Sequence, residues 1–271
     1  MPSKPISEAL PDPTLKQALT RFLEKREHHK RDVMMEPIPA DGSTRHFSRL
    51  ISAAGDALAV VMVNPPSTPM AERENLAYLN IGRHLSEKGL CVPEIYGYHL
   101  ESGWFIMEDL GNRHLQDVVL SQTDFLPIYR DVLEQLVRLQ IRGAEDFDSS
   151  WCCQTEVYDL TVMRRYESDY FRDAFLRGYL GLNDTGSELE SAFVHLAENA
   201  SKADCRFFLH RDFQSRNILI SGKKIGLVDW QGGGWAPWPM TWLLFSSTPT
   251  RVFLNSSGRA CLIRMSNGSG M

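Results

Sequence analysis

The sequence lacks a long hydrophobic run, an excess of basic residues and any cysteine pattern typical of a metal site. Its longest apolar run, residues 57–63, is far too short to cross a bilayer, and its polar N-terminus has no secretory-signal core. The net charge of −5 disfavours nucleic acid or an acidic membrane as the main partner. The five cysteines are odd in number and form no metal-ligand pair, which predicts reduced structural thiols. We therefore expect a cytoplasmic protein that binds neither nucleic acid nor membrane.

The first hundred residues mix helical and strand patterns. Asp12 and Pro13 open an amphipathic helix, and residues 37–66 read as an antiparallel hairpin. A second helix is expected over 72–88, ended by Gly89. Two further strands are expected over 92–98 and 103–107.

Beyond Asp109 the apolar residues return to helical spacing, through 126–139 and again through 158–182. At residues 107–111 the pattern changes from mixed helix and strand to mainly helix, so we place a domain boundary there. The 271 residues, 43% of them hydrophobic, are enough for two modest cores. The sequence thus predicts an α+β protein with one unit over 1–108 and a second over 109–271.

The segment from His210 to Gln231 reads HRDFQSRNILISGKKIGLVDWQ and contains two short apolar strands around a polar turn. If the strands pair symmetrically, Asn217 and Asp229 face each other at the open end. An amide oxygen and a carboxylate there suit Mg²⁺ carrying phosphates. Asp212 would lie on the preceding loop, where it can accept a proton from a hydroxyl group.

Each of these residues also has an ordinary structural interpretation. Asp and Asn often cap strand ends, and a lone His210 is more often a packed core histidine. Together, however, an HxDxxxxN loop, a hydrophobic hairpin and a following Asp form a specific composite with a mechanical reason for each part. The composite favours a catalytic function.

HRDFQSRN followed by GLVDWQ resembles the aminoglycoside phosphotransferase and choline kinase superfamily, and most of all its bacterial N-acetylmuramate/N-acetylglucosamine kinase branch. The resemblance implies a two-lobed protein-kinase-like fold, with a small β-rich N-lobe and a mainly helical C-lobe. It implies transfer of the ATP γ-phosphoryl group to a small-molecule hydroxyl, with Asp212 as catalytic base. Asn217 and Asp229 would bind Mg²⁺, while His210 and Arg211 would support the loop.

The resemblance extends to the nucleotide-covering parts of the N-terminal half. In ADGSTRHFSRL, Gly42 and Ser43 would let backbone N–H groups approach the phosphates, although any hairpin turn looks similar. ALAVVMVNPP resembles the strand that carries the phosphate-binding lysine of protein kinases, but Met62 or a neighbour stands in its place. Arg45 or Arg49 would then supply the positive charge.

Two further segments match nucleotide-site elements of the superfamily. Glu74, in ERENLAYLNIGRHL, matches the helix glutamate that orders the N-lobe, or else is a solvated surface residue. WFIMEDLG resembles the interlobe hinge, where the backbone from Glu108 to Leu110 would meet adenine; the alternative is a plain strand end. Its position at the predicted boundary between the two units favours the interpretation as a hinge.

The substrate is less well defined than the reaction. The helical segment EVYDLTVMRRYESDYFRDAF offers acidic and aromatic side chains, namely Tyr158, Glu167, Asp169 and Tyr170. They would bind a cationic aminoglycoside, or they form a solvated helix face. We favour a sugar or amino sugar; the alternatives are an aminoglycoside or choline-type substrate, or an inactive nucleotide-binding remnant.

The tail over 236–271 does not resemble the superfamily, whose members continue with an Asp-containing segment and several helices. Back-translation of this tail in a shifted reading frame permits the expected pattern. In that frame the codons of Trp238 and Met240 require an Ala and an Asp. We therefore expect a frameshift near residues 233–236, and an incomplete C-lobe. The alternative is a divergent native tail.

Overall fold

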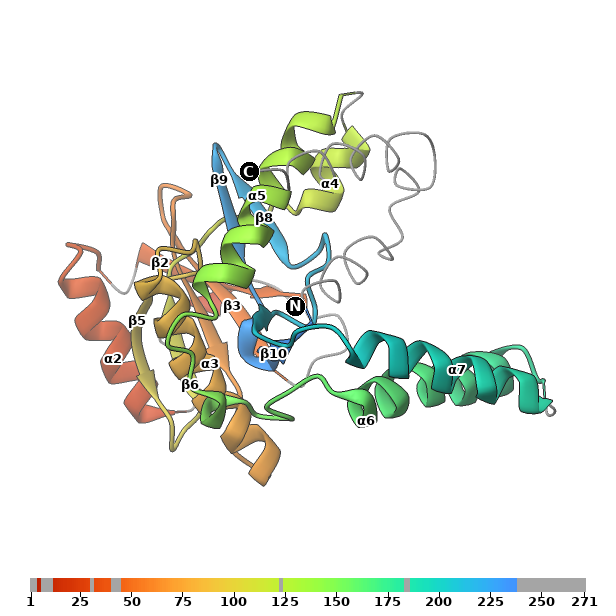
Figure 1. The fold of residues 1–271 in the computed structure, drawn as a ribbon. Coiled ribbons are helices and arrows are strands. Elements are labelled where there is room, and N and C mark those ends of the chain that lie inside the picture. The colour runs from red at the N-terminus through yellow and green to blue at the C-terminus, as the bar shows by residue number, and fades with distance from the viewer. Residues whose placement is uncertain are drawn as a thin grey trace.

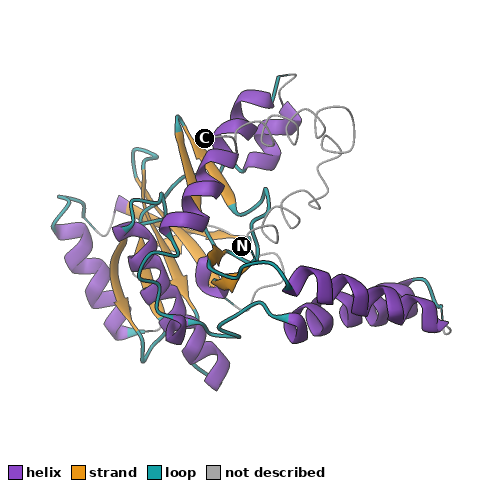
Figure 2. Ribbon diagram, in the orientation of Figure 1, coloured by secondary structure: helices purple, strands orange, loops and turns teal. Residues whose placement is uncertain are grey.

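The computed structural model describes residues 4–5, 12–29, 32–39, 45–121, 124–182 and 186–237, with backbone alone for 4–5 and 186–188. An antiparallel sheet occupies one side of the molecule, and most of the helices belong to the other (Figures 1 and 2). The prediction of an α+β fold is therefore confirmed. No described helix is both long enough and apolar enough to span a membrane.

The sheet has six strands in the order β1-β2-β3-β4-β6-β5, and all neighbours pair antiparallel. Its β3–β4 hairpin is the one that the sequence predicts, and the strand predicted to begin at residue 92 begins at Ile95. The strands are β1 (Lys4–Pro5), β2 (Val33–Ile38), β3 (His46–Ser52), β4 (Ala57–Val63), β5 (Ile95–His99) and β6 (Trp104–Met107).

Helices α2 (Pro13–Glu24) and α3 (Pro69–Glu87) cover opposite faces of this sheet. Alternation along the strands separates the two faces, since Val61 shares a buried cluster with α2 and Met62 shares another with α3. Asp12 caps α2, as predicted. The helix predicted over 72–88 was placed to begin too late, because Thr68 caps α3 and the helix runs from Pro69 to Glu87.

The second half contains helices α4 (Leu115–Ser121) and α5 (Leu126–Arg142), followed by a helical arm that projects from the body (Figure 1). In the arm, α6 (Leu160–Val162) continues into two π-helical segments, η3 (Met163–Asp169) and η4 (Phe171–Tyr179). Helix α7 (Gly186–Ser201) returns along it. The predicted helix over 158–182 is thus confirmed in place, but much of it has π-helical rather than α-helical hydrogen bonding.

Two small antiparallel pairs follow the arm. Strands β8 (Ile218–Ser221) and β9 (Lys224–Leu227) form the predicted hairpin, and β7 (Phe207–Leu209) pairs with β10 (Gly234–Ala236). The chain is described up to Pro237, so all but the first two residues of the predicted atypical tail lie outside the described residues. The frameshift and the lobe boundaries stay predictions.

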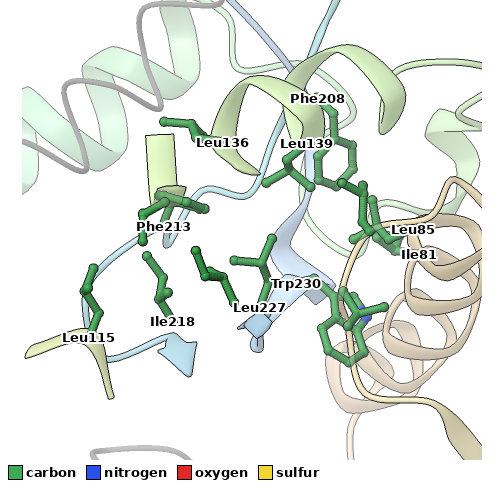
Figure 3. Packing of buried hydrophobic residues seen from close by; sticks show 14 of the residues in the cluster. Ile81, Leu85, Leu115, Leu136, Leu139, Phe208, Phe213, Ile218, Leu227 and Trp230 are labelled. Carbon is green, nitrogen blue, oxygen red and sulfur yellow. The ribbon is translucent and has the colours of Figure 1, made fainter. Parts of the chain in front are cut away.

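Trp230 joins the two halves of the main core. It is fully buried, and its indole N–H donates to the carbonyl oxygen of Tyr78 in α3 at 2.9 Å. Ile81 and Leu85 of α3 belong to the same packed cluster as Trp230 and Leu227 (Figure 3). Helix α3 is therefore fixed against the segment that follows β9.

Replacing Gly82 with alanine should loosen this contact. A Cβ at Gly82 would lie 2.8 Å from the indole of Trp230, so either the indole ring or helix α3 would have to move. We expect a loss of about 1–3 kcal/mol in the free energy of unfolding, measured by urea denaturation, despite the better helix propensity of alanine. Gly97→Ala is the control, because its Cβ would meet Trp104 at an ordinary 3.9 Å. A Gly82→Ala protein as stable as wild type would contradict the close packing.

Candidate active site

A cleft of about 960 Å³ lies where the sheet meets the β8–β9 hairpin. Side chains from β2, β3 and β4 line it together with residues that follow β6 and residues from the loop before β8. It brings together most of the predicted site residues that the structure describes, namely Arg45, Glu108, Leu110, Asp212, Asn217 and Asp229.

Asp212 and Asn217 form one hydrogen-bonded unit in the loop before β8. The Nδ2 group of Asn217 donates to the Asp212 carboxylate at 2.8 Å and to the Asp212 carbonyl oxygen at 3.0 Å. Gln214 donates to the same carboxylate at 3.1 Å. Because both Nδ2 hydrogens are used in this way, the Oδ1 atom of Asn217 is the part of the amide left to bind a ligand.

The pairing of β8 with β9 differs from the prediction by one residue. Ile218 is opposite Leu227, so Asn217 is opposite Val228, whose N–H donates to the Asn217 carbonyl oxygen at 3.0 Å. The predicted face-to-face pairing of Asn217 with Asp229 is therefore wrong. The reason is the turn, which has two residues between the paired Ser221 and Lys224.

Asp229 follows the hairpin in a left-handed backbone conformation, with φ 69°. Its carboxylate forms an ion pair with Arg45, with Nη2 and Oδ1 2.6 Å apart, and accepts a hydrogen bond from Gln231 at 3.2 Å. The two ion-paired side chains are 12% and 28% exposed. A guanidinium is thus held beside the predicted metal ligand.

The sequence left Arg45 and Arg49 open as sources of positive charge, and the structure separates them. Arg45 pairs with Asp229, whereas Arg49 pairs with Asp109 just after β6. Met62, at or next to the position that the resemblance assigns to the lysine of kinases, is fully buried in the core cluster. The strand therefore contributes packing at this position and no charge to the cleft.

His210 and Arg211 lie behind the cleft. His210 is 1% exposed, and burial lowers the pKa of its imidazole below 6.5, although Asp229 and Asp212 favour the protonated form. Arg211 has a left-handed φ of 64° and bonds to the loop before the arm, donating to the hydroxyl of Thr155 at 2.7 Å and to Gln154 at 2.9 Å. Burial also lowers the pKa of Arg211. Both placements suit the predicted supporting role.

The predicted hinge lies at one end of the cleft. The Glu108 N–H donates to the carbonyl oxygen of Glu94 at 2.8 Å, so this donor is already engaged. Leu110 is 6% exposed and packs so tightly on Gly226 of β9 that a Cβ there would clash with its side chain. The hinge segment is thereby fixed to both the sheet and the hairpin.

Three predicted nucleotide-site residues are not placed in the cleft. Gly42 and Ser43 lie outside the described residues. Glu74 is not among the described side chains that line the cleft; Tyr78, one helical turn later, lines it instead. Sequence reasoning missed Tyr78 and Asp109, although the four-residue spacing from Glu74 on one helix face could have indicated Tyr78.

The proposed substrate helix uses its charges internally. The Tyr158 hydroxyl donates to Glu167, and burial together with this carboxylate raises the pKa of Tyr158. Asp169 pairs with Arg172 at 2.8 Å and Arg164 at 3.5 Å, while Tyr170 is 69% exposed. None of these side chains is among the described residues that line the cleft.

Known sequences resemble this chain over most of its length. A sequence model of the family described as "Phosphotransferase enzyme family" (APH) matches residues 35–238. The N-acetylmuramate/N-acetylglucosamine kinase of Pseudomonas aeruginosa is 28% identical over 200 residues, covering 72% of this chain and 54% of that protein. The kinase of the same name from Caulobacter vibrioides is 23% identical, covering 81% of this chain and 69% of that protein. The chain spans about half the length of the Pseudomonas relatives that it matches.

Solved structures share the fold at low identity. Plasmodium vivax ethanolamine kinase matches with a TM-score of 0.55 at 12% identity, covering 89% of this chain and 69% of that chain. The streptomycin–ATP complex of APH(2")-IIa matches with a TM-score of 0.52 at 13% identity, covering 87% and 75%. These likenesses confirm the predicted protein-kinase-like fold.

Burial of neutral His210 predicts a pH dependence of stability. The folded-state pKa lies below the ordinary 6.5, so the unfolded chain binds a proton first as pH falls, and stability decreases below about pH 6.5. We expect His210→Leu to reduce the loss of unfolding free energy between pH 7 and pH 5 by about 1–2 kcal/mol, measured by urea denaturation. The exposed His195 provides the control, as His195→Leu should keep the wild-type slope. Equal slopes in all three proteins would contradict the neutral buried state.

Proposed function

The chain belongs to the phosphotransferase enzyme family, and from that membership we propose that it transfers the γ-phosphoryl group of ATP to a hydroxyl of a sugar or amino sugar. The single observation that carries the proposal is the Asp212–Asn217 unit in a cleft that Asp229 also lines. These are the base and the two oxygen-donating side chains that phosphoryl transfer needs, in one place.

The donor set fits a magnesium ion that carries phosphates. Among the described residues, no three His, Cys, Asp or Glu side chains gather as metal ligands. Asp229 offers a carboxylate, and Asn217 offers an amide oxygen whose orientation its Nδ2 bonds fix. Mg²⁺ accepts such a small protein contribution because phosphate oxygens and water complete its shell. When bound, Mg²⁺ neutralises charge on the transferred group.

Residues of the chain itself accept the proton, supply positive charge to the phosphates and bind adenine. Asp212 is exposed to the cleft and accepts the proton of the acceptor hydroxyl, whose oxygen forms the new bond to the γ-phosphorus while the bond to the β–γ bridging oxygen breaks. Arg45 lies beside Asp229 and supplies positive charge to the phosphates in place of the missing lysine. The backbone around Leu110 receives adenine at the hinge.

The carboxylates of the arm give little support to a cationic aminoglycoside, and this favours an N-acetylated amino sugar, which carries no ammonium group. Asp169 is already paired with arginines, and Glu190 of α7 pairs with Arg164 and Arg172. Carboxylates neutralised in this way offer little to an extra cation. The names of the Pseudomonas and Caulobacter relatives favour the same substrate class.

A second candidate is a nucleotide-binding chain without transfer activity. The observation that favours it is the buried Met62, because the resemblance to kinases places a phosphate-binding lysine at or next to this position. Such a chain would gain thermal stability from Mg-ATP and yet phosphorylate nothing. The cytoplasmic location, the magnesium dependence and the lack of nucleic-acid or membrane partners stay predictions.

Replacing Asp212 with asparagine tests the proposed base. The amide keeps the size of the side chain but cannot accept the hydroxyl proton, so kcat with ATP and N-acetylglucosamine or N-acetylmuramate should fall about 10²–10⁴-fold. Binding of ADP should stay within about threefold of wild type, since the base does not hold the nucleotide. Asp131→Asn on α5, where the carboxylate is 51% exposed, is the matched control. Undiminished turnover by Asp212→Asn would refute the assignment.

Removing the charge of Arg45 tests its phosphate role. One charge-assisted contact corresponds to about 10–100-fold in affinity, so Arg45→Met should lower kcat/KM for ATP by about that factor. Arg45→Lys should recover part of the loss. Arg177→Met serves as control, since Arg177 is 49% exposed and pairs within the arm. Wild-type kcat/KM in Arg45→Met would show that the positive charge comes from elsewhere.

A further inference from the structure

Arg49 is committed to the hinge by three hydrogen bonds. Its Nε atom donates to Oδ2 of Asp109 at 2.5 Å, and its Nη2 atom donates to Oδ1 of Asp109 at 3.1 Å. Nη2 also donates to the carbonyl oxygen of Gly111 at 2.9 Å. The planar fork of arginine suits such a two-pronged contact, which lysine cannot reproduce.

The hinge turn closes around the same carboxylate. Oδ1 of Asp109 accepts the N–H of Gly111 at 2.8 Å, and Gly111 adopts a left-handed φ of 90°. We call Arg49, Asp109 and Gly111 the hinge clamp. It couples the middle of β3 to the segment that leads out of β6.

The ion pair of the clamp is shielded from solvent, whereas Gly111 is exposed. The Asp109 side chain is 4% exposed and that of Arg49 is 18% exposed. A carboxylate so buried is strongly destabilised when its partner is removed, whereas removal of both charges is tolerated better. Removal of one partner of this contact is therefore expected to cost far more than removal of one partner of an ordinary surface ion pair.

The clamp and Arg45 both contribute to the lining of the cleft. Arg45 lies just before β3, and Phe47 and Arg49 follow in β3 at every second position, so the three share one face and all line the cleft. At about 3.3 Å per residue, the two arginines are roughly 13 Å apart along the chain. The Arg45 guanidinium thus pairs with Asp229, whereas the Arg49 guanidinium is bonded to the hinge.

We propose that Arg49 is a positioning residue for the nucleotide: through Asp109 it holds the hinge backbone against the sheet, and so sets the affinity of the cleft for the adenine nucleotide. The Nε and Nη2 groups of Arg49 are used by Asp109 and Gly111, so this side of the guanidinium is directed at the hinge and not at the phosphates. The inference rests on the proposed nucleotide-dependent function and adds the residue that shapes the base end of the site. Val60, paired with Arg49 on β4, and Leu219 are apolar residues that line the same cleft.

The test measures binding of a fluorescent ADP analogue, without acceptor, to variants of the full chain. We expect the Kd to rise about tenfold or more for Arg49→Met and about threefold for Arg49→Lys, which keeps the charge but loses the fork. Asp109→Asn with Arg49→Met should bind better than Arg49→Met alone, because no buried charge is left unpaired. Arg130→Met, at a position 64% exposed on α5, should match wild type.

Two further readouts separate positioning from a merely structural role. Amide hydrogen exchange at residues 110–112 should be faster in Arg49→Met than in Arg130→Met, with the rest of the sheet unchanged. The KM for ATP should rise in step with the ADP Kd while kcat stays within about twofold of wild type. Should Arg49→Met fail to fold, as judged by circular dichroism, Arg49→Lys carries the same comparisons.

The outcomes are distinct from those of the proposed function. Wild-type ADP affinity in Arg49→Met overturns the inference, whether or not hinge exchange is faster, because the clamp then does not act on the nucleotide. A wild-type chain that binds ADP but phosphorylates no amino sugar contradicts the proposed acceptor substrate. The role of the clamp is then still tested by the ADP Kd and by amide hydrogen exchange in the variants. A wild-type chain that binds no ADP overturns both.

Discussion

The burial of Trp230 under α3 is the contact on which the rest of the site depends. Its indole is fully buried, bonds to the Tyr78 carbonyl oxygen and stacks obliquely on the Tyr78 ring at 4.5 Å. The residue before it is Asp229, so the same packing that closes the core also sets where this carboxylate lies. Burying a large aromatic side chain contributes several kcal/mol, which makes this position hard to vary. Core and site are thus built by one residue pair, Asp229–Trp230.

Two ion pairs then connect residues 45–49, in and just before β3, to Asp229 and to the hinge. Arg45 reaches Asp229, and Arg49 reaches Asp109 in the hinge. In protein kinases a strand lysine would supply the cleft with charge, but here Met62 points into the core at that position. Arg45, just before β3, brings a positive charge to the lining of the cleft, and Tyr78 rather than Glu74 is the α3 residue that lines it.

Much of this arrangement could be predicted from the sequence, because strong local signals coincide with the global fold. The Asp12 cap, the β3–β4 hairpin and the loop with Asp212 and Asn217 all follow from short patterns. What could not be predicted depends on register and tertiary contacts. The turn has two residues between its paired ends, and this even number places Asn217 opposite Val228, whereas pairing with Asp229 would need an odd number. The choice between Arg45 and Arg49 depends on which carboxylate the folded chain brings near, which no local pattern encodes.

We propose that the cleft around Asp212, Asn217 and Asp229 transfers a phosphoryl group to an amino sugar. Phosphorus NMR of the wild-type chain incubated with Mg-ATP and N-acetylglucosamine follows this reaction, since each phosphorus species has its own resonance. We expect a sugar phosphate resonance that grows in step with ADP. Unchanged ATP, or ADP accompanied only by inorganic phosphate, would contradict it.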